Sequence, residues 1–287
     1  MRIRATVAAV TGALALSALA VPAAQAQDHT PSLASLVPST KATPFTAAAP
    51  ADETVGDTKI TGVTVNGGKN IVVGTTVKKS FTVSVTATDP TGIYDAYPVL
   101  WHGSDPDNAD GVITPDNLDD EQVGSCSHSS ATTATCKVTL VADPQTNIYA
   151  NLLAGTWKVW VGAAGNDGDY VIRDAYKTTK VQRASKLTVN ASPEPVTKGK
   201  TITVTGKLSR ANWDDLQYHG YTGQSVKLQF RKKSASTYTT VKTITSNSTG
   251  ELKTTVKASA DGYFRYSFAG TTTTPAINAT GDFVDVR

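Results

Sequence analysis

The sequence predicts an all-β protein whose mature part forms two antiparallel β-sandwich domains in tandem. Thr, Val and Gly are abundant while Leu and Glu are sparse, a composition that favours strands over helices. Apolar and polar residues alternate with period two in many short segments. Turn-forming sequences separate these segments, and about seven short strands in each half are typical of a sandwich.

The N-terminus has the pattern of a signal peptide over residues 1–26. Arg2 and Arg4 supply a positive start, residues 5–20 are apolar, and Ala24-Gln25-Ala26 is a small-x-small cleavage site. The apolar run is shorter than the roughly 20 residues that a membrane span needs. We therefore expect a secreted, extracellular protein without a membrane span.

Composition and charge divide the rest of the chain. Residues 27–57 are rich in Ala, Pro and Thr and predict a disordered linker. An acidic domain is expected over 58–183 and a basic domain over 184–287. Residues 52–183 carry 10 basic and 16 acidic side chains, whereas residues 184–287 carry 14 and 7. This asymmetry indicates either distinct partners or two domains that face each other.

In the first domain the clearest strand is 81–88, where Phe81, Val83 and Val85 alternate with polar residues. Turns are expected at 66–68 and 89–92, and 166–169 favours a hairpin turn over a second acidic site. Further strands are predicted near 97–102, 122–128, 134–141, 156–163 and 170–182, with a short helical turn at 147–153. In the second domain, strands are predicted near 187–189, 202–208, 226–230, 252–256, 264–268 and 283–286.

Parts of both domains resemble known secreted proteins. The stretches 195–200, 204–208, 226–231 and 262–266 resemble immunoglobulin-like modules of secreted actinomycete proteins. The first domain, with Gly155-Thr156-Trp157-Lys158-Val159-Trp160 and its acidic loop, is similar to an uncharacterised secreted actinomycete family with an N-terminal domain of unknown function. The resemblance implies export and two tandem immunoglobulin-like antiparallel β-sandwich domains, and it implies no catalytic residue. Members of related families are sometimes labelled calcium-binding.

The two cysteines, Cys126 and Cys136, flank a short polar stretch between two predicted strands. A disulfide that staples this hairpin suits an exported chain. Zinc is a poor alternative because no second Cys or His pair stands at ligand spacing.

An acidic loop at 105–121 is the candidate metal site. It holds seven acidic residues, and no Lys or Arg lies between Trp101 and Lys137. Calcium prefers six to eight oxygen ligands, and an ion would relieve the repulsion between these carboxylates. The spacing is not that of an EF-hand, so the alternative is a solvated acidic loop. The candidate calcium ligands are Asp105, Asp107, Asn108, Asp110, Asp116, Asp119 and Asp120.

Four aromatic residues are candidates for stacking on a ligand such as a sugar. Period two places Trp157 in the core and turns Trp160 outward, while Trp213, Tyr218 and Tyr221 lie in one loop region at a predicted sandwich edge. Packing, including packing between the domains, is the alternative.

The sequence favours a noncatalytic binding or structural protein of the extracellular space or cell envelope, ordered by Ca²⁺ if the acidic loop binds it. No nucleophile elbow, zinc helix or phosphate loop is present. The alternatives are a carbohydrate-binding accessory protein and a secreted hydrolase. Expected partners are a cell-wall or secreted polysaccharide or a protein, with no nucleic acid, and the chain is expected to be a monomer. The basic run 231–233 is either a solvated strand end or a contact for an acidic cell-wall polymer.

Overall fold

The computed structural model describes residues 52–287. The predicted signal peptide at 1–26 and the linker as far as residue 51 therefore lie outside the described residues. The last residues of the expected linker do form structure, because Thr54 and Val55 pair with Val171 and Tyr170. Within the described range, no helix is both long and apolar enough to cross a membrane.

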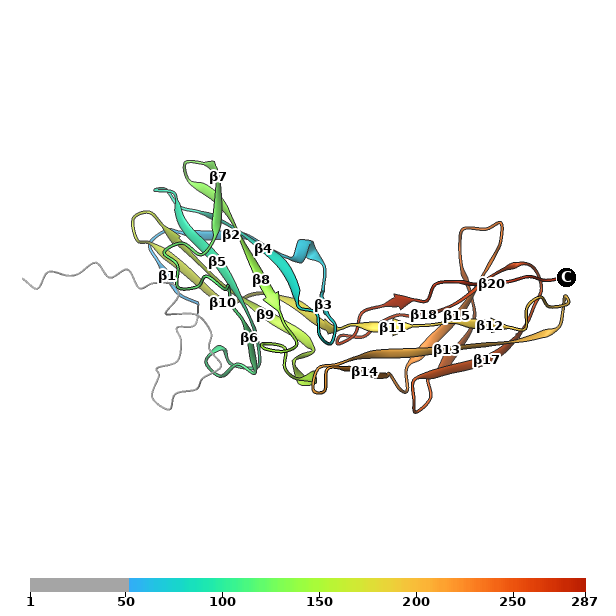
Figure 1. Cartoon of the computed structure of the whole chain (residues 1–287). Coiled ribbons are helices and arrows are strands. Elements are labelled where there is room, and N and C mark those ends of the chain that lie inside the picture. Colours follow the sequence, from blue (N-terminus) through green and yellow to red (C-terminus); the bar gives the residue numbers. More distant parts are fainter. Residues whose placement is uncertain (1–51) are drawn as a thin grey trace, which may run out of the picture. The chain divides into compact units, whose positions relative to one another are not determined.

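The first sandwich consists of two sheets around one core (Figure 1). One sheet has the order β2-β4-β8-β7, and the other has the order β1-β10-β9-β5-β6 with β3 added in parallel to the end of β10. The strands are β1 Thr54–Val55, β2 Lys59–Val65, β3 Ile71–Val73, β4 Lys79–Thr88, β5 Ile93–His102, β6 Gly111–Ile113, β7 Ser125–Ser130, β8 Thr133–Ala142, β9 Gly155–Gly165 and β10 Tyr170–Arg183.

This strand order is that of an immunoglobulin fold. The sheet β2-β4-β8-β7 corresponds to strands A, B, E and D, and β10-β9-β5 corresponds to G, F and C. Period two explains the pairing of the first sheet, because β4 buries Phe81, Val83, Val85 and Ala87 and exposes or half-buries the residues between them.

The second sandwich also has two sheets (Figure 1). β13 pairs with β11, β12, β14 and β17 in one sheet, and the other sheet has the order β16-β15-β18-β19 with β20 beside β18. This arrangement, A-B-E facing C′-C-F-G, is again a sandwich of immunoglobulin type. The strands are β11 Ser185–Leu187, β12 Asn190–Ser192, β13 Thr201–Asn212, β14 Gln217–Gly220, β15 Ser225–Lys232, β16 Thr239–Thr245, β17 Glu251–Lys257, β18 Gly262–Phe268, β19 Ile277–Asn278 and β20 Asp282–Val284.

The all-β prediction is confirmed, and the differences have local reasons. β16 was not predicted because six of its seven residues are exposed, so it has no apolar face. The expected helical turn at 147–153 is a single 3₁₀ turn, η4, at Asn151–Leu153. Two further 3₁₀ turns are η2 at Asn66–Gly68 and η3 at Pro106–Asn108, and η2 needs the positive φ of Asn66 and Gly67.

Candidate functional site

The predicted disulfide is confirmed. Cys126 on β7 lies directly opposite Cys136 on β8, and the two sulfur atoms are bonded. The bridge therefore joins neighbouring strands of one sheet. Next to it, Asp95 of β5 is buried and accepts backbone hydrogen bonds from Val123 (2.9 Å) and Gly124 (2.9 Å). Asp95 thus fixes the end of the acidic loop at the start of β7.

The acidic loop places its predicted ligands in separate local contacts. Asp105 begins η3 by accepting from the backbone N–H of Asp107 (3.0 Å), and Asp110 contacts His102 Nδ1 (3.1 Å). The other predicted ligands, all exposed, are Asn108, Asp116, Asp119 and Asp120. Within residues 52–287, none of the seven belongs to a group of three metal-ligating side chains whose ligand atoms lie within 4.8 Å of one another. The calcium site predicted here stays a prediction.

The acidic loop places negatively charged side chains close to Asp174 of β10. Partial burial, followed by repulsion from Asp52, Asp107 and Asp105, raises the pKa of Asp174 to about 6. The indole of Trp101 donates to the backbone carbonyl of Asp174 (2.7 Å), which fixes this part of β10 next to the loop. Negative charge is therefore concentrated at the bulge of β10, which lies between Arg173 and Lys177.

A different set of carboxylates does converge. Oxygen atoms of Asp57, Asp89 and Asp169 lie within 4.8 Å of one another where the 56–58, 89–92 and 166–169 turns meet. Burial acts to raise the pKa of Asp89, but the hydrogen bonds from Thr58 and Thr91 outweigh it, and the net shift is downward. Asp169 accepts from the backbone N–H of Asp57 (2.9 Å). These bonds account for the close approach of the three turns as part of the fold.

The prediction that Trp160 points outward is wrong. Its side chain is fully buried, because β9 is covered on both faces from Val159 to Ala163. Trp213 is also buried, with 1% of its surface exposed, and it belongs to the core of the first sandwich although it lies between β13 and β14. Neither tryptophan presents a ring to a sugar.

The two predicted tyrosines are half-buried and already in contact with cations. Lys186 Nζ lies 3.8 Å from the ring centre of Tyr218, and the guanidinium of Arg210 lies 3.9 Å from that of Tyr221. Tyr221 also meets Phe268 edge to face. The aromatic loop predicted as a ligand site is therefore occupied by contacts within the protein.

A further set of contacts connects the two sandwiches. It involves residues 183–184, η4 and residues 211–219 of the β13–β14 hairpin, and we call it the joint. Ala184 is the single residue between β10 and β11, and its N–H donates to Val73 O (2.8 Å) while its carbonyl accepts from Ala211 N (2.7 Å). The indole N–H of Trp213 donates to Gly74 O (2.9 Å). At the crossing from one sandwich to the next, the N–H of Ala184 is therefore hydrogen-bonded to the first sandwich and its carbonyl to the second.

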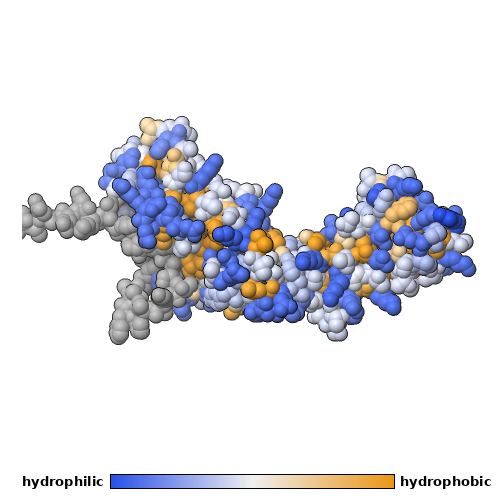
Figure 2. All heavy atoms as spheres, viewed as in Figure 1, coloured by the Kyte–Doolittle hydropathy of each residue, from blue (hydrophilic) through white to orange (hydrophobic). Residues whose placement is uncertain are grey.

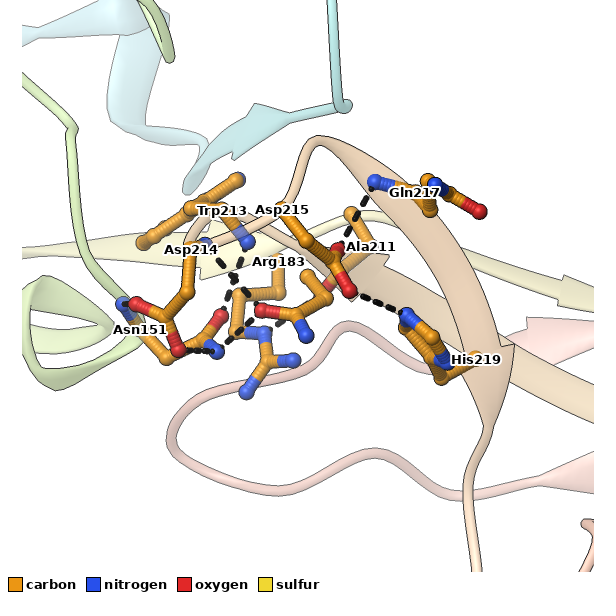
Figure 3. A network of polar contacts seen from close by, with 9 residues as sticks. Asn151, Arg183, Ala211, Trp213, Asp214, Asp215, Gln217 and His219 are labelled. Carbon is orange, nitrogen blue, oxygen red and sulfur yellow. Dashed lines mark hydrogen bonds and ion pairs between the residues drawn. The ribbon is translucent and has the colours of Figure 1, made fainter.

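Figure 3 shows the polar side of the joint. The amide of Asn151, in η4, donates to Asn212 and Asp214, and its oxygen accepts from the backbone N–H of Trp213 (2.9 Å). Buried Arg183 donates from Nε to Ala211 O (2.6 Å). Burial and the neighbouring Arg210 lower the pKa of Arg183 to about 10, so it stays charged at neutral pH beside Asp214.

No family model matches the sequence, and no curated protein matches it. Several solved structures are similar at low identity. The "D00-D0 domain of Intimin" is 16% identical, with a TM-score of 0.24 over 77% of this chain and 98% of the other. The "I-band fragment I67-I69 from titin" is 13% identical, with a TM-score of 0.31 over 83% of this chain and 66% of the other. A "Putative membrane anchored protein from Corynebacterium diphtheriae" is 13% identical, with a TM-score of 0.25 over 78% and 53%. The strand order, and not these scores, defines the class as tandem immunoglobulin-like sandwiches.

Proposed function

We propose that the chain is exported and acts outside the cell as a noncatalytic binding or structural protein of the extracellular space or cell envelope. The observation that carries the proposal is that residues 211–219, in the β13–β14 hairpin, contact the first sandwich. Loops at the end of such a sandwich commonly carry ligand sites, whereas here Trp213 and Asp214 join one sandwich to the other. A joint that bonds the two sandwiches to each other suits a protein that holds a binding surface in a defined position.

Three further features support the proposal. The leader-like residues 1–26 and the actinomycete resemblance favour export, and the Cys126–Cys136 bridge suits an oxidising compartment. The carbohydrate-binding alternative loses Trp160 and Trp213 as stacking residues because both are buried. The hydrolase alternative gains no support from the acidic loop, because its predicted ligand residues lie in separate contacts.

Cell fractionation tests the export that the proposal requires. An antibody against the purified protein should find it in the culture fluid or the envelope fraction, with Gln27 as its first residue and without free thiols. Detection of the intact chain from Met1 in the cytoplasm, with both cysteines reduced, would contradict the proposal. A cytoplasmic marker protein measured in the same fractions controls for cell lysis.

A further inference from the structure

The outer face of the β15/β18 sheet carries an ordered set of cations and aromatic rings. Outward positions of β15 hold Lys227, Gln229 and Arg231, and outward positions of β18 hold Tyr263 and Arg265. The register pairs Arg231 with Tyr263 and Tyr263 with Phe283 of β20, so these three residues form one row across three strands. Gln229 pairs with Arg265 in the next row.

The rings hold the guanidinium groups in place. Arg231 lies 4.3 Å from the ring centre of Tyr263, and Arg265 lies 3.8 Å from that of Tyr238. Arg265 Nε also donates to Gln229 Oε1 (2.9 Å), and Arg231 donates to Ala235 O (2.6 Å). Stacking and hydrogen bonding reduce the conformational entropy that each arginine has left to lose on binding.

These cations have no acidic partner within the described residues. Neither Arg231 nor Arg265 forms an ion pair there. The two carboxylates that directly precede Gly262 and Phe283 in sequence bind backbone N–H groups instead: Asp261 accepts from Val286 N (2.9 Å), and Asp282 accepts from Ala191 N (2.7 Å). The second sandwich also carries 14 basic against 7 acidic side chains. The face is therefore complementary to a polyanion.

The cations follow a line. Lys227 and Arg231 lie on the same side of β15, and Lys233 follows the strand with its Nζ 5.3 Å from the ring centre of Phe283. At about 3.3 Å per residue, this line is on the order of 20 Å long. Figure 2 shows hydrophilic and hydrophobic residues interspersed on the visible side of the second sandwich. On the β15/β18 face itself, cations lie beside the rings of Tyr263, Tyr238 and Phe283. This combination suits an extended chain that offers carboxylates and the apolar faces of sugar rings in alternation.

We infer that this face, consisting of Lys227, Gln229, Arg231, Lys233, Tyr238, Tyr263, Arg265 and Phe283, binds a linear acidic polysaccharide. The inference rests on the proposed extracellular function and names the partner class and the surface. Planar guanidinium groups donate pairs of hydrogen bonds to carboxylates, and the rings between them pack against the sugar. Arg231 and Arg265 are the positions at which most of the affinity should lie.

Calorimetric titration of residues 27–287 with polygalacturonate at low ionic strength tests the inference. The R231Q/R265Q variant should bind at least about tenfold more weakly, because two charge-assisted contacts are lost. K253Q/K257Q is the matched control, because it removes the same charge from exposed positions of β17 in the opposite sheet, and its affinity should stay within about twofold of wild type. R231K/R265K should be intermediate, since it keeps the charge and loses the planar stacking.

Two other probes define the class of ligand. Methyl-esterified polygalacturonate has the same sugar backbone without the charges and should not bind, and polyglutamate should bind more weakly than polygalacturonate. If R231Q/R265Q and K253Q/K257Q lose affinity for polygalacturonate equally, the overall charge of the protein and not the proposed face determines binding. Equal binding of the ester, equal binding of polyglutamate, or no binding of polygalacturonate by the folded wild type would each overturn the inference. None of these outcomes bears on export, which the fractionation tests separately.

Discussion

At the scale of single residues, position in the tertiary structure overrides the local pattern. Period two correctly assigns Phe81, Val83 and Val85 to a core face. The same rule fails at Trp160, because β9 is buried on both faces there. One strand pattern cannot show whether a second layer covers the polar face, so the exposure of a lone aromatic residue is not predictable from alternation.

Asp174 gives a residue-scale prediction that depends on pH. Burial, and then repulsion from Asp52, Asp107 and Asp105, raises its pKa from the usual 3.8 to about 6. A carboxyl with a raised folded-state pKa binds its proton more tightly in the folded protein, so the stability it contributes is full below pH ~4 and is lost as pH rises through ~6. Asp174→Asn should therefore be more stable than wild type above pH 6, and the difference should shrink toward pH 4.

Urea unfolding at a series of pH values measures this difference. Asp116→Asn, which removes an exposed charge from the acidic loop, is the control and should show a smaller difference that depends less on pH. Added salt should reduce the gain of Asp174→Asn, since it screens the same repulsion. A gain that is independent of pH would show that ionisation of Asp174 is not its cause.

At the scale of elements, the disulfide couples β7 to β8 at the edge of a sheet. β7 exposes five of its six residues, so it contributes little apolar surface to the core. The bridge closes a loop of sequence separation 10, and cross-linking of this kind is worth about 3 kcal/mol in the chain-entropy model. We expect the bridge, more than packing, to hold β7 in place.

The C126S/C136A variant should accordingly lose up to about 3 kcal/mol of unfolding free energy, measured by chemical denaturation. Hydrogen exchange should show the loss of protection concentrated in residues 125–130. Wild type under reducing conditions should behave like the variant. Unchanged protection of β7 in both cases would mean that the strand is held by its backbone pairing alone.

The elements were predictable where an apolar face repeats and were missed where it does not. β4, β8, β9, β13 and β18 lie close to their predicted positions, whereas exposed β16 and the short β14 were not predicted. The acidic loop was recognisable from composition, but the convergence of Asp57, Asp89 and Asp169 was not, because three turns far apart in sequence meet there. Of the β15/β18 face, the sequence indicates only the basic run 231–233. Its partners Tyr263, Arg265 and Phe283 follow only from the strand register.

At the scale of the whole molecule, the joint couples the two sandwiches. Trp213 packs in the core of the first sandwich, while the strand that leads to it, β13, forms the centre of a sheet in the second. No local pattern identifies this role, because the contact between Trp213 and Gly74 spans 139 residues. An aromatic loop in a sequence therefore indicates either a ligand site or a joint, and only the fold decides between them.

Trp213→Ala should separate the unfolding of the two sandwiches. Truncation of a buried tryptophan costs about 3–5 kcal/mol, and here the cost falls on the first core and on the contact between the sandwiches. Scanning calorimetry should show one coupled transition in wild type and two transitions in the variant. Asp215→Ala, which removes the exposed pair with His219 and the hydrogen bond from Gln217 N within the β13–β14 hairpin, should leave the wild-type profile. An unchanged profile in Trp213→Ala would show that the joint does not couple the sandwiches.

The most direct test of the central claim is co-sedimentation of purified residues 27–287 with isolated envelopes of the organism that makes the protein. A noncatalytic envelope-binding protein should sediment with the envelopes at low salt and be released by high salt, and the envelope polymers should keep their length. Failure to sediment at any salt concentration, or a progressive release of shorter polymer fragments, would contradict the account.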